Sequence, residues 1–204
     1  YKTTSLLLIR ENKKGSYSAR NKGAQIAKGE LLLFTDSDCI VDKDWAMRLV
    51  NRFEDNKICS VFGKVLAYKP TTALELFGNR YVFNCNQMPF EFPRCGNCAI
   101  RKSLFEELNG FDENFISGGD IDFGIRLRKN NLSIYYEPEA IVYHQHRDTL
   151  WRLFQQYKKY GSGWLLLKKK WGMELMMYSN WKRMLISFIY LFLTIFDLLL
   201  YFLG

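Results

Sequence analysis

The N-terminal part of the chain alternates between short apolar runs and longer segments with apolar residues at helical spacing. Three runs predict strands, at 5–9 (SLLLI), 31–35 (LLLFT) and 58–63 (ICSVFG). The segments 16–29 and 42–55 place apolar residues three or four positions apart and predict amphipathic helices. Strands that alternate with helices are typical of βαβ units, so we expect an α/β fold with a mostly parallel sheet.

Two aspartates end the second apolar run, in the stretch LLLFTDSDC. Asp36 and Asp38 lie at the carboxyl end of a predicted strand, the end at which open α/β sheets bind ligands. Their charges cannot both be buried without water, a cation or a ligand. Mg²⁺ and Mn²⁺ take carboxylate oxygens together with phosphate oxygens. The spacing fits a metal-held phosphate and equally a solvated turn that caps the next helix.

Phosphatases of the haloacid dehalogenase type also carry D-x-D at the end of a strand. They have Thr or Val two residues after the second aspartate, whereas this chain has Ile40 there. A motif match of this length is only a hypothesis, and this departure argues against it.

The net charge of +8 is concentrated in one segment rather than spread over the chain. Residues 151–183 hold eight Lys or Arg against one acid, whereas residues 1–150 hold 21 basic and 19 acidic side chains. A nearly neutral main domain argues against a nucleic-acid partner, which needs clustered basic residues. With 48% hydrophobic residues, the chain can bury a sizeable core.

An apolar stretch at 184–203 comes after the basic segment and carries a single charge, Asp197. It is long enough to span a bilayer, and basic residues beside a span mark the cytoplasmic side. We therefore expect a main domain at 1–147 that faces the cytoplasm, a basic amphipathic membrane-interface segment at 148–183, and a transmembrane helix at 184–203. A buried helical hairpin is the alternative, because a charge in the bilayer centre is costly.

The cysteines are odd in number and scattered, which argues against a disulfide framework. They are Cys39, Cys59, Cys85, Cys95 and Cys98. The last two have the spacing of half a zinc site, but no second pair comes after them. We expect packing thiols.

Three longer segments resemble family 2 glycosyltransferases of the GT-A fold. Residues 15–45 carry A-R-N-x-G, the A-x-G-E turn and D-x-D, all in the order typical of that family. Residues 96–130 carry a small-residue loop, G-F-D-E and G-x-D-x-D-F, and residues 137–161 resemble the next segment of membrane-associated members. The resemblance implies a GT-A-type, Rossmann-like sheet with flanking helices.

The resemblance also implies transfer of a sugar from a nucleotide-diphosphate donor with Mn²⁺ or Mg²⁺ as cofactor. It places these residues at the donor: Arg20, Asn21, Asp36 and Asp38. It assigns metal binding to Asp36, Asp38 and His144, and His146 shares one strand face with His144. A solvent-facing salt bridge of Arg20 and a pair of surface histidines are the alternatives.

Asp120 occupies the position of the family's catalytic base. The usual Glu before it is Gly119 here, and Asp122 is an alternative base or a helix-start charge. A charge at a helix N-terminus is also the alternative for Asp120. Asn97 lies in the loop where relatives contact the acceptor, although a turn residue explains it as well.

The stretch QQYKKY at 155–160 resembles the Q-x-x-R-W motif of processive polysaccharide synthases. Gln156 matches, but Lys159 replaces Arg and Tyr160 replaces Trp, and Lys lacks the bidentate fork of Arg. We therefore expect a single-sugar transferase or short-chain extender that acts on a lipid-linked or polysaccharide acceptor. A catalytically silent sugar-nucleotide-binding or membrane-assembly module is the alternative. Because relatives begin with a strand and a nucleotide-gripping loop that are not seen before Tyr1, we also expect an N-terminally truncated domain.

Overall fold

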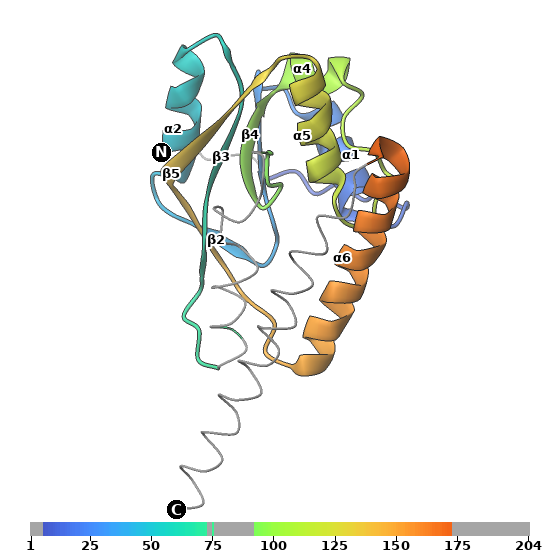
Figure 1. Cartoon of the computed structure of the whole chain (residues 1–204). Helices are drawn as coiled ribbons and strands as arrows, with labels where there is room; N and C mark the ends of the chain where they lie inside the picture. Colours follow the sequence, from blue (N-terminus) through green and yellow to red (C-terminus); the bar gives the residue numbers. More distant parts are fainter. Residues whose placement is uncertain (1–5, 73–74, 76–91, 173–204) are drawn as a thin grey trace, which may run out of the picture.

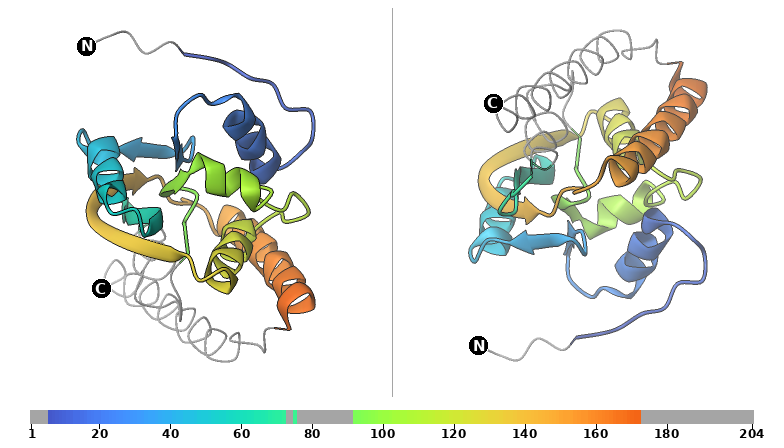
Figure 2. Two further views of the ribbon diagram at one scale, coloured as in Figure 1. Left: turned by 90° about the horizontal axis from the view of Figure 1, so that it is seen from above. Right: turned by 90° about the horizontal axis from the view of Figure 1, so that it is seen from below.

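A computed structural model describes residues 6–72, 75 and 92–172 of the chain (Figure 1). These residues form one five-stranded sheet that is covered by helices on both faces (Figure 2). In chain order the elements are α1 (Ser16–Ile26), β1 (Leu31–Thr35), β2 (Cys39–Val41), α2 (Trp45–Asn51), the 3₁₀ turn η1 (Arg52–Glu54), β3 (Ile58–Ala67), β4 (Asn97–Arg101), α4 (Lys102–Glu107), α5 (Gly119–Lys129), β5 (Ser133–His144) and α6 (Leu150–Trp171).

The sheet is mixed, with the strand order β1-β4-β3-β5-β2. β3 and β5 pair in parallel, whereas β1 with β4, β3 with β4, and β2 with β5 pair antiparallel. The prediction of a mostly parallel sheet is therefore wrong. β4 comes from much later in the chain and lies between β1 and β3, which the local alternation of strands and helices cannot reveal.

Most of the predicted N-terminal elements are confirmed. α1, β1 and the start of β3 lie where the hydrophobic pattern placed them, and the predicted helix at 42–55 becomes α2 followed by η1. The strand predicted at 5–9 is wrong: residues 6–9 form no strand, and Leu6 is 97% exposed. An apolar run becomes a strand only beside a strand that takes its hydrogen bonds, and the described residues place none there.

The core has two parts, one on each face of the sheet. The larger part lies under α1, α4, α5 and α6 and is rich in aromatic rings: Phe34, Phe105, Phe111 and Phe123 lie with neighbouring centroids 5.0–5.7 Å apart. The smaller part lies under α2, where Trp45, Leu49 and Val61 are buried. The larger core fixes α1 and α5 against each other.

α6 packs on the same side as α5 through Leu153, Gly163 and Leu167. A side chain at Gly163 would not fit, because a Cβ atom there would lie 2.3 Å from the carbonyl oxygen of Ser117. Among the described helices, none is long and apolar enough to cross a membrane. The span predicted at 184–203 lies outside the described residues.

The cysteines of the described part are free. Cys59, Cys95 and Cys98 are buried and Cys39 is half-buried, while Cys85 lies outside the described residues. The burial of Cys59, Cys95 and Cys98 agrees with the expectation of packing thiols, whereas Cys39 lies in a candidate metal group.

Candidate active site

An ion pair between Arg20 and Asp36 joins α1 to the loop after β1. The side chain of Arg20 is only 16% exposed, so the alternative of a solvent-facing salt bridge is wrong. The loop then makes a short turn, in which the Cys39 amide donates to the Asp36 carbonyl at 3.1 Å. Arg20 thus holds Asp36 at the carboxyl end of β1.

Asp38 faces away from that pair, toward the end of β5. Its Oδ1 lies 3.5 Å from His144 Nε2, and its Oδ2 lies 3.6 Å from the Arg147 guanidinium. The antiparallel register that pairs Cys39 with His144 produces this contact. His144 and His146 are both buried, with ring centroids 5.1 Å apart, so the alternative of surface histidines is wrong.

A candidate metal group within the described residues consists of Asp38, Cys39 and His144, whose donor atoms lie within 4.8 Å of one another. Burial, with Asp36 and Asp38 nearby, raises the pKa of Cys39 to about 11, so this thiol is protonated at neutral pH. Burial lowers the pKa of His144 and leaves a neutral imidazole that can bind a metal. Asp38 and His144 therefore fit a divalent cation, whereas Asp36 is held by Arg20.

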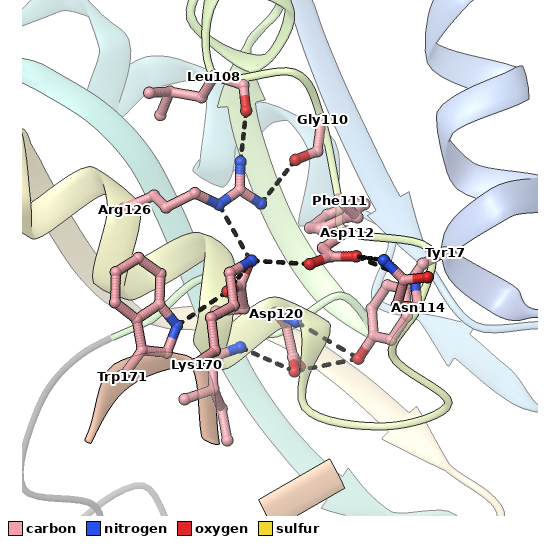
Figure 3. Close-up of polar contacts among 12 residues, drawn as sticks. Tyr17, Leu108, Gly110, Phe111, Asp112, Asn114, Asp120, Arg126, Lys170 and Trp171 are labelled. Carbon is pink, nitrogen blue, oxygen red and sulfur yellow. Dashed lines mark hydrogen bonds and ion pairs between the residues drawn. The ribbon is translucent and has the colours of Figure 1, made fainter. Parts of the chain in front are cut away.

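Asp120 lies in the first turn of α5, where Figure 3 shows it beside Tyr17. Its Oδ1 accepts hydrogen bonds from the Tyr17 hydroxyl at 3.2 Å and from the Ile121 amide at 3.0 Å. Burial raises the pKa of the Asp120 carboxyl, while the Ile121 amide, Arg20 and Tyr17 partly oppose this rise. A carboxylate in this position is a stronger base than an exposed aspartate.

Asp122, two residues further on, is fully buried and surrounded by donors. It accepts from Arg126 Nε at 3.0 Å and from Trp171 Nε1 at 2.9 Å, and Lys170 Nζ lies 2.8 Å away. These contacts tie the end of α6 to α5. They assign Asp122 to the structure and correct the expectation that it could serve as an alternative base.

Asn21 is also used inside the protein. Its Nδ2 donates to the Phe111 carbonyl at 2.8 Å and to Glu113 at 3.0 Å, and its Oδ1 accepts from the Phe111 amide at 2.9 Å. The A-R-N segment thus holds the G-F-D-E loop in place. These hydrogen bonds give Asn21 a structural role, and its contact with the donor stays a prediction.

Asn97 is fully buried at the junction of three strands. Its Oδ1 accepts from Trp45 Nε1 at 2.8 Å, and its Nδ2 donates to the carbonyls of Lys64 at 2.9 Å and Ala140 at 2.8 Å. An amide enclosed in this way does not reach an acceptor. The expected acceptor contact of Asn97 is therefore corrected as well.

The residues that resemble Q-x-x-R-W lie on α6. Gln156 Nε2 donates to the Tyr160 hydroxyl at 2.8 Å, and Lys159 is exposed. Burial raises the pKa of Tyr160 to about 12, and the charge of Asp120 contributes to the rise. Gln156 and Tyr160 thus lie toward the candidate site, whereas Lys159 lies on the outer surface.

Sequence reasoning missed Tyr17 and Arg147. Tyr17 precedes Arg20 by three positions on α1, and this spacing places two side chains on one helix face. Arg147 lies three positions after His144 and contacts Asp38. The sequence could have signalled both residues through their spacing from residues that were already candidates.

Comparison with known proteins assigns the chain to a family. The family model described as "Glycosyl transferase family 2" matches residues 5–109, just over half of the chain. The chain therefore belongs to glycosyl transferase family 2, and the resemblance found in the sequence is confirmed.

Three curated relatives share between 26% and 28% identity with the chain. Glycosyltransferase AglE of Haloferax volcanii is 28% identical over 148 residues, which cover 69% of this chain and 48% of that protein. O-antigen chain rhamnosyltransferase RfbN of Salmonella typhimurium is 26% identical, with 66% and 47% covered. Glucosyl-dolichyl phosphate glucuronosyltransferase of Haloferax volcanii is 27% identical, with 79% and 54% covered. The chain thus spans about half the length of these relatives.

A solved structure supports the fold. The crystal structure of GalNAc-T7 with UDP, GalNAc and Mn²⁺ matches with a TM-score of 0.50 and 18% identity, over 68% of this chain and 32% of that one. At this identity the likeness concerns the fold alone. It supports the expected GT-A-like α/β architecture, here with a mixed sheet.

Proposed function

We propose that this chain forms the catalytic part of an inverting glycosyltransferase that moves a sugar from a nucleotide-diphosphate donor to a lipid-linked or polysaccharide acceptor. The observation that carries the proposal is the placement of carboxylates around Arg20, which binds Asp36 and lies close enough to Asp120 for its charge to oppose part of the burial-driven rise in the pKa of Asp120. In this proposal Asp36 lies on the donor side, and Asp120 is a separate carboxylate that is available for proton transfer. The names of the O-antigen and dolichyl phosphate relatives support the acceptor class.

Asp38 and His144 are the residues that would hold a divalent cation. Their donor atoms are a carboxylate oxygen and a neutral imidazole nitrogen, a set that favours Mn²⁺ over Mg²⁺. When bound, such a cation neutralises negative charge on the diphosphate leaving group. Arg147, beside Asp38, offers a further positive charge to a phosphate.

Asp120 is the proposed general base. Both hydrogen bonds found for its carboxylate in the described part of the chain go to Oδ1, which leaves Oδ2 for the acceptor hydroxyl. Oδ2 takes the proton, and the hydroxyl oxygen bonds to the anomeric carbon. The bond from that carbon to the diphosphate oxygen breaks, and its electron pair leaves with the diphosphate. Attack opposite the leaving group inverts the anomeric carbon.

We also propose that the protein works at the cytoplasmic face of a membrane. On α6, Trp151 and Phe154 stack with centroids 5.8 Å apart and are 67% and 59% exposed. Exposed aromatic residues on a basic amphipathic helix are typical of the membrane interface. The apolar stretch at 184–203 supplies a second, stronger anchor in the sequence.

The membrane proposal is tested by truncation after Gly172. This cut keeps Lys170 and Trp171, which hold Asp122, and removes the apolar stretch. We expect the truncated protein to leave the membrane fraction on sedimentation, and replacing Trp151 and Phe154 by Ser to weaken any residual binding to vesicles. Unchanged sedimentation of the truncated protein would refute the anchor.

The proposed reaction is tested first at the donor site. We expect Asp38→Asn to abolish Mn²⁺-dependent binding of sugar nucleotides and transfer, because an amide cannot supply the charge of the ligand. Calorimetric titration with UDP-, GDP- and dTDP-sugars, with and without Mn²⁺, measures the binding. Asp55→Asn, at an exposed aspartate before β3, is the matched control.

Two results would contradict the proposal in different ways. Unchanged Mn²⁺-dependent binding by Asp38→Asn would remove Asp38 from the metal site. Tight binding of a donor by the unaltered protein, without transfer to any acceptor and without hydrolysis, would favour the catalytically silent module.

A further inference from the structure

We propose that Tyr17 is the positioning residue for Asp120, and that it occupies the space left open by Gly119. The proposal rests on the proposed function, in which Asp120 takes the proton of the acceptor hydroxyl. Tyr17 itself does not touch the reacting atoms. It determines which carboxylate oxygen of Asp120 is available to them.

The contacts between Tyr17 and Asp120 run in both directions (Figure 3). The Tyr17 hydroxyl donates to Asp120 Oδ1 at 3.2 Å and accepts from the Asp120 amide at 3.4 Å. The Ile121 amide donates to the same Oδ1 at 3.0 Å. The two donors fix the plane of the carboxylate and leave Oδ2 for the acceptor. A hydroxyl that binds both the backbone and the side chain of one residue holds it more firmly than either bond alone.

Gly119 makes this contact possible. A Cβ atom at position 119 would lie 2.8 to 3.0 Å from three ring carbons of Tyr17, closer than such atoms approach each other. The ring cannot easily give way, because Tyr17 is only 5% exposed and packs against Phe111 with centroids 5.5 Å apart. A side chain at position 119 and the Tyr17 ring therefore exclude each other. This gives a physical reason for glycine at the position where relatives usually carry Glu.

The groups that face Asp120 come from three elements besides its own. They are Tyr17 and Arg20 on α1, Cys98 in β4 with Cys95 just before that strand, and Tyr160 on α6. Burial raises the pKa values of both thiols and both phenols, so these groups are neutral at pH 7. Arg20 is the single charged group in this set, and Tyr17 the single direct side-chain donor.

Removal of the Tyr17 hydroxyl should therefore act on the charge of Asp120 and not only on packing. A hydrogen bond donated to a carboxylate favours its ionised form, so its loss raises the pKa of the acid. Tyr17→Phe keeps the ring that fills the core and removes only the donor. A role confined to packing predicts no change in the titration of Asp120.

The test is a carboxyl-carbon NMR titration of the protein labelled at aspartate, with Asp120→Asn used to assign the Asp120 signal. We expect Tyr17→Phe to shift the titration midpoint of Asp120 to higher pH. Tyr135→Phe, at a tyrosine on β5 that is 38% exposed, should leave it unchanged. An unshifted midpoint in Tyr17→Phe would overturn the proposal, whatever reaction the protein catalyses.

A second variant keeps the proposal falsifiable if Tyr17→Phe does not fold. Gly119→Ala places a methyl group against the Tyr17 ring, and we expect it to displace the hydroxyl and shift the Asp120 midpoint in the same direction. If Gly119→Ala folds and the titration midpoint of Asp120 is unchanged, the claim that a side chain at position 119 and the Tyr17 ring exclude each other is wrong.

Turnover separates this inference from the proposed function. We expect Tyr17→Phe to lower kcat by roughly tenfold with unchanged donor affinity, and to move the acidic limb of the pH–rate profile to higher pH. Full turnover in Asp120→Asn would refute the proposed base. Loss of turnover in Asp120→Asn, together with a normal rate and pH profile in Tyr17→Phe, would refute only the role of Tyr17.

Discussion

Two regions of the molecule carry aspartates with the same one-residue spacing, and the fold uses them differently. In the loop after β1, Asp36 and Asp38 are both partly exposed and face different partners, Arg20 and His144. At the start of α5, the hydrogen bonds that Asp120 accepts from Tyr17 and Ile121 both go to Oδ1, whereas Asp122 is enclosed by donors. The first pair is divided between an arginine and a candidate metal group, and the second between a proposed general base and a carboxylate with structural contacts.

The difference shows that spacing does not determine the role of a carboxylate. In a helix, residues two positions apart point in clearly different directions, so Asp120 and Asp122 meet different neighbours. Asp122 meets Lys170 and Trp171 from α6: the Lys170 ammonium forms an ion pair with it, and the Trp171 indole donates a hydrogen bond. Asp120 meets a phenol and a backbone amide, and burial raises the pKa of its carboxyl despite these two donors. The neighbouring residues, and not the sequence motif, give Asp120 and Asp122 different roles.

The largest expected effect is that of Asp120→Asn on turnover. We expect kcat to fall by roughly 10² to 10⁴, the usual contribution of a positioned base, with donor affinity nearly unchanged. Steady-state kinetics at saturating donor, combined with calorimetric donor titration, measures both quantities. If donor affinity falls as far as kcat does, Asp120 belongs to the donor site. Its role would then no longer differ from that of Asp38, the proposed metal ligand at the donor.

The same variant should be more thermostable than the unaltered protein at neutral pH. Burial raises the pKa of Asp120 in the folded state, so the charged form destabilises the fold above that pKa. As the pH falls through the raised pKa toward the ordinary value, the Asp120 carboxylate of the unaltered protein becomes protonated and this cost disappears. The gain in Tm should therefore be present at pH 7.5 and shrink on acidification. A gain that is constant with pH would contradict this origin.

A smaller effect, on stability instead of turnover, is expected for Asp122→Asn. The substitution leaves Lys170 and Arg126 near a neutral amide, although Lys170 keeps its bond to Asp112 at 2.7 Å. We expect the free energy of unfolding to fall by about 2 to 3 kcal/mol. Urea unfolding monitored by tryptophan fluorescence measures the change.

Asp112→Asn is the matched control, because it removes a more exposed partner of the same lysine. We expect a cost below about 1 kcal/mol for that variant. Equal costs for the two variants would show that burial does not distinguish Asp122, and a loss of turnover at full stability in Asp122→Asn would make it a candidate base again.

Part of the fold could be predicted from local pattern, and part could not. α1 and β1 were predicted because their apolar residues repeat at helical or strand spacing over a sufficient length. The position of β4 was not, because strand pairing joins residues that are far apart in the chain and leaves no local trace. For the same reason, the apolar run at 5–9 predicted a strand that the described residues 6–9 do not form.

The candidate site, like the fold, was predicted from the sequence only in part. The sequence by itself made Asp38, Asp120 and His144 the candidates for metal binding and proton transfer, because the segments that carry them resemble family 2 glycosyltransferases. Only the tertiary structure decided that Asn97 is enclosed and that Tyr17 holds Asp120. Those outcomes depend on which side chains from distant elements reach the same small volume, and burial and hydrogen bonding act there regardless of distance along the chain.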